Sequence, residues 1–203
     1  MATETTNSFV TTKAVDLHSI FNDVEEVYFK DSETEDVAGL SALSGVIELP
    51  VLSDGVTFNS GEANVTQIKL TTEVIWTSKA TRGDADISFN VPSIAGVIND
   101  MFMNQKEADA ALEIDGKYFS GKGYNFAPKK VIGTLILPSN DKMAVLVLPK
   151  VEIYASFNAA DGDNPAYFSM KCTPLENKAG SELYILEKGT KPESGGDEPE
   201  PEE

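Results

Sequence analysis

Two strongly apolar runs joined by a short polar turn occupy residues 131–157, and they constrain the fold more than any other part of the chain. The segment reads VIGTLILPSNDKMAVLVLPKVEIYASF. Most positions of both runs are apolar, and apolar and polar residues alternate from Val151 to Phe157. This pattern is typical of antiparallel strands, the last with one buried and one polar face. Only Pro149 interrupts the second run, so the sequence predicts strands long enough to cross a domain.

Further strands are expected on both sides of this segment. Residues 65–78 (VTQIKLTTEVIWTS) are dense in Thr, Val, Ile and Trp, which favour pleated surfaces. The face that carries the apolar residues changes near Glu73, which predicts a bulge or bend there. Turn-forming residues separate the other apolar runs. These runs predict strands at residues 45–52, 87–91, 166–173 and 181–186.

A hairpin is predicted near the middle of the chain. Asp115 and Gly116 join residues 112–114 to residues 117–119, and an Asp-Gly pair between such runs is a strong hairpin signal. Residues 121–123 (GKG) then predict a loop.

One main helix is expected at residues 93–103. Its apolar side chains recur at helical spacing, which predicts an amphipathic helix that plugs a sheet or barrel. Residues 105–111 are expected to add a turn of helix. The apolar stripe consists of Ile94, Val97, Ile98, Met101 and Phe102.

Together these patterns predict an all-β protein of eight to ten strands with one main helix, built as an antiparallel β-sandwich or barrel. Residues 9–188 are expected to form a single domain, and residues 31–44 an acidic loop or mobile segment within it. Residues 1–8 read as a flexible arm. Residues 189–203, rich in Pro, Gly and acid, read as a disordered acidic tail.

The chain is strongly acidic, with 33 acidic and 16 basic residues and a net charge of −17. Binding of nucleic acid through its phosphates needs clusters of Lys and Arg, so the charge argues against that function. The same charge suits a surface that nucleic acid passes without sticking, because like charges repel. Solubility alone is the simpler explanation of the charge.

Cysteine usage and hydropathy exclude further classes. The single cysteine, Cys172, excludes a disulfide framework within the chain and a metal site built from several cysteines. It lies in a strand-like run, so we expect it to be buried. The first ten residues lack the features of a secretory signal, and no apolar run approaches the ~18 residues of a membrane helix. We therefore expect synthesis in the cytoplasm and no membrane partner.

Three patterns resemble functional motifs but lack parts that the chemistry needs. Residues 116–123 (GKYFSGKG) fit the start of a phosphate-binding loop, but Gly123 stands where Ser or Thr would hold magnesium. His18 is the only histidine, and the sequence gives it no triad partners. Asp161 and Asp163 lack the full spacing of a calcium-binding loop and read as a turn, with calcium binding left open. We expect no enzyme activity, no cofactor and no catalytic residue.

Taken whole, residues 9–188 resemble the major tail proteins, or tail tube proteins, of long-tailed bacteriophages. The likeness lies in the order of elements. A polar N-terminal arm and the acidic segment at 31–44 come first, and the run VTQIKLTTEVIWTSKATRGDADISFNVPS then leads into the helix at 93–103. A closing β-meander follows from Val131 to Leu186, including LVLPKVEIYASF and AYFSMKCTPL.

This resemblance implies a structural virion protein that forms rings, usually hexameric, which stack into a tail tube. Such a tube conducts the genome DNA through a lumen that is usually acidic. The implied partners are further copies of the chain, with tape-measure and tail-terminator proteins, and the implied location is the virion tail after assembly in the host cytoplasm. Residues 31–44 would reach a neighbouring ring. The contact residues expected there are Glu33, Glu35, Asp36, Val37, Leu40 and Leu43.

Two other classes of protein also fit the sequence. A capsid decoration or head–tail connector protein would share the all-β character but would assemble differently. A β-sandwich adhesin or carbohydrate-binding module would favour a secretion signal and an exposed aromatic platform, and the only Trp, Trp76, sits in the middle of the predicted strand at 65–78. The runs at 131–137 and 143–148 are apolar on both faces. Packing within one domain or against a neighbouring subunit explains them equally well.

Overall fold

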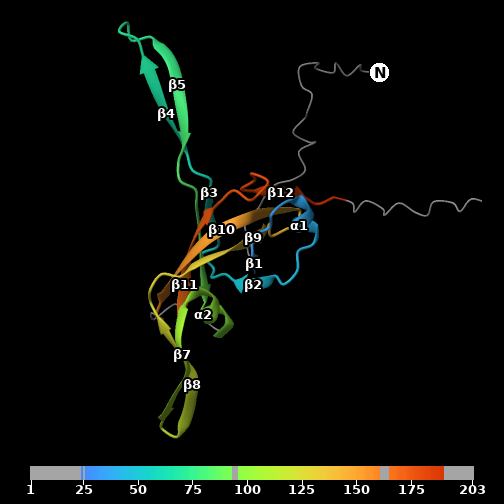
Figure 1. Cartoon of the computed structure of the whole chain (residues 1–203), viewed down its shortest axis with the longest axis vertical. Helices are drawn as coiled ribbons and strands as arrows, with labels where there is room; N and C mark the ends of the chain where they lie inside the picture. Colours follow the sequence, from blue (N-terminus) through green and yellow to red (C-terminus); the bar gives the residue numbers. More distant parts are fainter. Residues whose placement is uncertain (1–23, 25, 93–95, 161–164, 190–203) are drawn as a thin grey trace, which may run out of the picture.

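The fold, seen in a computed structural model, is mostly β and antiparallel (Figure 1). The structure describes residues 24, 26–92, 96–160 and 165–189, and these contain twelve strands and two helices. The predicted arm at 1–8, most of the predicted tail at 189–203, His18, Asp161 and Asp163 lie outside the described residues. The all-β antiparallel class is confirmed.

Eight strands form one central sheet in the order β2-β1-β9-β10-β11-β6-β3, with β12 also paired to β10. Every pairing in it is antiparallel. Its two flanks approach each other where the backbone N–H of Leu52 donates to the carbonyl of Asn90 at 2.9 Å. The strands are β1 (Glu26–Lys30), β2 (Ile47–Pro50), β3 (Thr57–Asn59), β6 (Asp86–Pro92), β9 (Lys130–Pro138), β10 (Ala144–Asn158), β11 (Tyr167–Pro174) and β12 (Tyr184–Glu187).

Strand β10, with 15 residues, is the spine of this sheet. It pairs with β9 along both halves, with β12 along its first half and with β11 along its second half. Its pairing with β9 shifts register between Leu148 and Val151. Pro149 lies at this shift, where its missing N–H is tolerated. The predicted long strand with a break at Pro149 is therefore confirmed.

The core is one cluster of buried side chains from the central sheet, to which helix α2 (Gly96–Phe102) adds Ile98 and Phe102. The buried ring of Phe102 packs between those of Phe29 and Phe168, with centroids 6.1 and 6.3 Å away. The predicted helix is thus confirmed at 96–102, with Phe102 packed on the sheet, and its plugging role stays a prediction. One residue of the predicted stripe is wrong, because Val97 is 65% exposed, and Ile94 lies outside the described residues.

Two hairpins outside the central sheet correct three sequence predictions. Residues 65–78 were expected as one bent strand, but β4 (Ala63–Lys69) and β5 (Ile75–Arg82) pair as a hairpin. The change of apolar face near Glu73 is a turn, in which Glu73 has a φ of 64°. Residues 105–111 and 121–123 are neither helix nor loop, because they belong to β7 (Asn104–Ile114) and β8 (Lys117–Asn125).

The Asp115-Gly116 turn explains the second hairpin. Both residues have positive φ, 50° and 71°, and such turns match the twist of paired strands. Once the turn sets the register, pairing overrides the helix propensity of Ala108, Ala110 and Ala111. The predicted hairpin is therefore confirmed and is longer than expected.

The segment at 31–44 is also more ordered in its backbone than the loop that was expected. It contains helix α1 (Val37–Ser41), whose N-cap is Asp36. The Asp36 carboxylate accepts a 2.9 Å hydrogen bond from the backbone N–H of Gly39. An Asp directly before Val-Ala-Gly-Leu is typical of a helix N-cap. The many acidic residues of the segment favour a loop instead, which is why the sequence did not predict the helix.

Candidate assembly surfaces

The β4–β5 hairpin, residues 63–82, projects from one end of the molecule, and we call it the β4–β5 arm (Figure 1). Every residue of both its strands is solvent-exposed. Six residues of the arm, in the strands and the turn between them, are large, apolar and exposed, which is unusual for a surface that stays in water. The exposed apolar side chains are Val65, Ile68, Leu70, Val74, Ile75 and Trp76.

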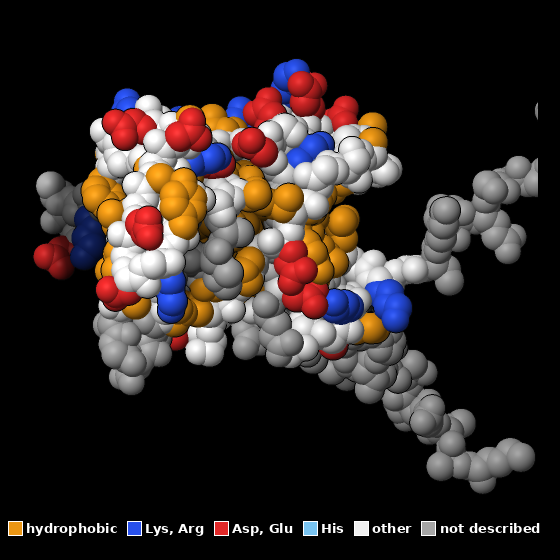
Figure 2. Space-filling model, turned by 90° about the horizontal axis from the view of Figure 1, so that it is seen from below, with side chains coloured by type: hydrophobic (Ala, Val, Ile, Leu, Met, Phe, Trp, Pro, Cys, Tyr) orange, Lys and Arg blue, Asp and Glu red, His pale blue; other side chains and the backbone are white. Residues whose placement is uncertain are grey.

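The β7–β8 hairpin, residues 104–125, projects from the opposite end along the longest dimension, and we call it the β7–β8 arm (Figure 1). Leu112 lies opposite Phe119 and Ile114 opposite Lys117, so Leu112, Ile114 and Phe119 share one face. All three are more than half exposed, and so is Tyr118. Figure 2 views the molecule from this end and shows hydrophobic side chains in several clusters among charged ones.

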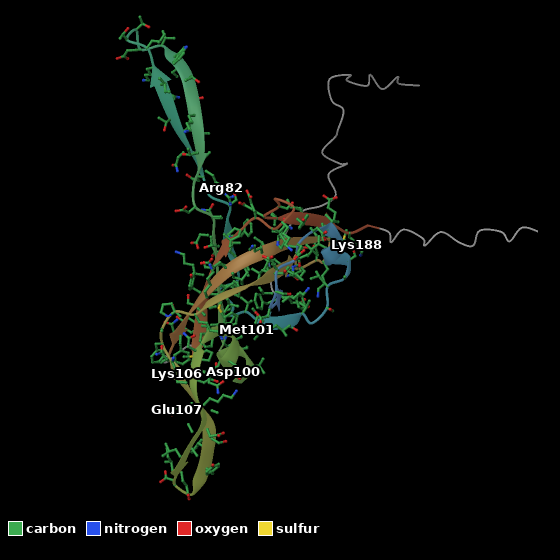
Figure 3. The ribbon with its side chains drawn as sticks, viewed as in Figure 1. Arg82, Asp100, Met101, Lys106, Glu107 and Lys188 are labelled. Carbon is green, nitrogen blue, oxygen red and sulfur yellow. The ribbon has the colours of Figure 1, made fainter. Side chains whose placement is uncertain are left out.

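The β4–β5 arm leaves the sheet through a narrow neck at Gly61 and Gly83. A Cβ on Gly61 would lie 2.4 Å from the carbonyl oxygen of Gly83, and Gly61 has a φ of 85°. A Cβ on Gly83 would lie 2.6 Å from the carbonyl oxygen of Glu62. Only glycine permits two chain segments to cross this closely. Arg82, at the junction of arm and sheet in Figure 3, forms an ion pair with Glu182.

The β7–β8 arm is tied to α2 by one polar cluster. The hydroxyl of Tyr124 donates to the Asp100 carboxylate at 2.6 Å, and Lys122 forms an ion pair with the same carboxylate. The hydrogen bond from Lys122, and then that from Tyr124, lowers the pKa of Asp100. The bond to Asp100 raises the pKa of Tyr124 to about 12. Figure 3 shows Asp100 beside the root of the arm, where Lys106 and Glu107 lie.

An aromatic groove of about 550 Å³ opens at the root of the β7–β8 arm. The Phe126 ring, 80% exposed, stacks on Phe157 with centroids 6.3 Å apart. Phe157 meets the buried Phe168 edge-on at 5.5 Å, so aromatic rings run from the core to the solvent. The lining residues are Phe102, Met103, Asn125, Phe126, Ala127, Pro128, Tyr154, Ala155, Ser156, Phe157 and Phe168.

The sequence-predicted contact segment divides into an anchored part and an exposed part. Glu33 forms an ion pair with Lys150 at 2.7 Å, and Glu35 forms one with Lys178. Asp36 caps α1. All three acidic side chains therefore make contacts within their own chain. The exposed Val37 and the partly exposed Leu40 and Leu43 remain on the surface.

A buried polar cluster anchors this segment to the sheet. The hydroxyl of Thr134 lies 2.8 Å from that of Thr34 and 2.9 and 3.0 Å from the carbonyl oxygens of Ser32 and Pro149. The Asn177 side-chain amide donates to the Thr34 carbonyl at 3.2 Å. Residues 32–34 are therefore held in place by groups far away in the sequence.

The two arms and the aromatic groove are surfaces that sequence reasoning missed. Residues that favour strands occur in an exposed hairpin as in a buried strand, so the composition of 65–78 does not distinguish the two. The groove is lined from α2, the end of β8, β10 and β11, which no local motif joins. The Asp-Gly turn was the one signal that pointed to an arm.

Three further features bear on function among the described residues: possible metal ligands, the single thiol and the length and hydropathy of the helices. These contain no group of three or more His, Cys, Asp and Glu side chains that could hold a metal ion. Cys172 is buried as predicted, and burial raises the pKa of its thiol. No helix in the described part of the chain has the length and hydropathy to cross a membrane.

Comparison with known families does not assign the chain: no family model matches it, and no curated protein matches it.

Proposed function

We propose that the chain is a structural subunit that assembles with copies of itself into stacked rings, and that these form the tail tube of a bacteriophage. The observation that carries the proposal is the pair of exposed apolar arms at opposite ends of the molecule. Single exposed apolar residues need no explanation, but contiguous exposed apolar surface marks an interaction site. Arms that project beyond the core reach neighbouring subunits while the core folds alone.

The finer fold class that we propose is a barrel-like sandwich of the tail-tube type. The long spine β10, shared by two groups of strands, supports it. The hydrogen bond between Leu52 and Asn90 supports it as well, because it brings the flanks of the sheet together. Helix α2 would then plug one open end, as Phe102 does between Phe29 and Phe168.

The charge fits a tube through which DNA passes. The net charge of −17 repels phosphate groups, so a lumen made by this chain would let DNA move without adhering to it. The role is structural in this account, with no catalysis, no cofactor and no membrane. Tape-measure and tail-terminator proteins are the further partners, and the location is the virion tail.

The segment at 31–44 is proposed as a second contact, toward the neighbouring ring. Its exposed Val37 and its partly exposed Leu40 and Leu43 form the contact surface. Glu33, Glu35 and Asp36 contribute by holding this surface in position through Lys150, Lys178 and the cap of α1.

Sedimentation velocity on the full chain, across a wide protein concentration range, tests the proposal. We expect species much heavier than one chain of 21.9 kDa, with mass that increases with concentration. A variant whose two hairpins are shortened at their turns should stay monomeric and folded. A full chain that remains a monomer at every concentration, with and without phage tail proteins, would contradict the proposal.

One observation favours a second candidate, a carbohydrate-binding module. Trp76, Tyr118 and Phe126 are exposed aromatic side chains of the kind that stack on sugar rings. Trp76 belongs to β5 and Phe126 follows β8, however, and these strands lie in hairpins that project in opposite directions, so the two rings do not form one platform. Binding to a glycan array by a chain that does not self-associate would favour this candidate.

A further inference from the structure

The aromatic groove has the chemistry of a site for another aromatic side chain. Its rings form a continuous series that starts with the buried Phe102 and Phe168 and ends with the exposed Phe126. Aromatic pairs stabilise one another beyond the area that they bury. A ring that enters the groove would cover Phe126 and Phe157, and about 550 Å³ is ample for one large side chain.

Trp76 has the matching chemistry at the opposite end of the molecule. It is the only tryptophan in the chain and is 70% exposed. Lys69 pairs with Ile75 and Ile68 pairs with Thr77, so Trp76 is the extra residue of a bulge. Bulges re-aim a side chain out of the regular alternation. The β4–β5 arm thus presents an indole that its own chain leaves uncovered.

The β4–β5 arm is net basic, although the chain as a whole is acidic. It holds three basic residues, Lys69, Lys79 and Arg82, of which Arg82 is paired with Glu182, and one acidic residue, Glu73. Residues 96–130, which include α2, the β7–β8 arm and the loop of the groove, hold five acidic and five basic residues. Like charges repel, so a β4–β5 arm favours the β7–β8 end of another copy, which has no excess of basic residues, over a second β4–β5 arm.

We infer that the β4–β5 arm of one copy docks at the β7–β8 end of a second copy and that Trp76 enters the aromatic groove there. This inference rests on the proposed self-assembly and names its contact. The donor belongs to the β4–β5 arm and the acceptor to the root of the β7–β8 arm, which projects in the opposite direction (Figure 1), so the contact is heterologous. Each docked pair of copies leaves one donor and one acceptor free, and the contact therefore propagates or closes into a ring.

Two single-site variants test the contact. One removes the side chain that enters the groove, and the other removes a ring that lines it. Trp76→Ala keeps the groove and loses the indole, whereas Phe126→Ser keeps the indole and opens the groove. Both residues are mostly exposed, so neither change should alter the unfolding midpoint of the monomer. Each variant alone should self-associate at least tenfold more weakly than the parent chain. Trp76→Phe, which keeps an aromatic ring, is the matched control and should retain most of the association.

Mixing the two variants gives the decisive readout. Only the Phe126→Ser chain contains tryptophan, so the fluorescence of the mixture reports on Trp76 alone. We expect its emission to shift to shorter wavelength, in a saturable way, as Trp76→Ala chains supply intact grooves. Unchanged emission in the mixture overturns the inference. So does weaker association of Phe126→Ser with no effect of Trp76→Ala, because another segment would then occupy the groove.

The parent chain separates this inference from the function on which it rests. If it assembles while Trp76 emission stays that of a solvent-exposed indole, the docking contact is wrong and the proposed self-assembly stands. If it does not assemble at any concentration, the proposed function fails.

Discussion

Replacing apolar residues of the β4–β5 arm should weaken self-association and leave the fold of the monomer unchanged. The variant is Ile68→Ser combined with Ile75→Ser. These side chains are 48% and 50% exposed, so about half of each remains available for burial by a neighbour. Full burial of an Ile side chain contributes about 2 kcal/mol, so half corresponds to about 1 kcal/mol each. The pair then contributes about 2 kcal/mol per contact, or about a 30-fold change in dissociation constant.

Sedimentation equilibrium measures the association, and urea unfolding at low protein concentration measures the stability of the monomer. We expect the dissociation constant to rise by about 30-fold and the free energy of unfolding to change by less than about 0.5 kcal/mol. Phe102→Ala is the matched core variant, and it should reduce the free energy of unfolding by about 3–5 kcal/mol. An arm variant that destabilises the monomer as the core variant does would refute the reasoning, because the arm would then belong to the core. Unchanged association would refute it as well.

Three further outcomes follow from the structure. Gly133→Ala should lower the free energy of unfolding, measured in a urea titration, by at least about 1–3 kcal/mol. The reason is that a Cβ at this position would lie 2.2 Å from the Lys30 carbonyl oxygen. An unchanged free energy of unfolding would contradict the close approach of the two segments. The buried Cys172 thiol, whose pKa is raised by burial, should react with a thiol reagent only after denaturant is added; rapid labelling of the native chain would contradict this. Lys122 lowers the pKa of Asp100. The contact between the two side chains therefore stabilises the fold above the ordinary aspartate pKa of about 4, and this stabilisation is lost as pH falls through the lower pKa that Asp100 has in the folded chain. The protection of β8 amides, measured as their exchange rate relative to an unstructured chain at the same pH, should therefore fall at low pH. Asp100→Asn should reproduce that loss of protection at neutral pH.

The strands of the central sheet were largely predictable from sequence, and the arms were not. In β10 the apolar run and the alternation from Val151 report burial directly, because solvent rarely surrounds so many consecutive apolar side chains. The strand-favouring residues of β4 and β5 predict strands equally well, yet every residue of both strands is exposed. Such residues identify a strand but do not say what covers it. The alanines of β7 favour helix locally, and only pairing with β8 makes them strand.

The candidate surfaces were predictable only in part, because they depend on contacts between distant segments. The acidic run at 31–44 pointed to a contact surface, but Glu33 and Glu35 pair with Lys150 and Lys178, more than a hundred residues away. The aromatic groove brings Phe126, in the loop after β8, against Phe157 of β10. Composition shows that such residues are present, and the fold determines which of them meet.

Negative-stain electron microscopy of the purified full chain at high concentration tests the central claim most directly. We expect rings or long hollow tubes, with their symmetry visible in end views, and the same chain with both arms shortened should show only isolated particles. Fields of separate particles of about 22 kDa at every concentration, even with phage tail proteins added, would contradict the account.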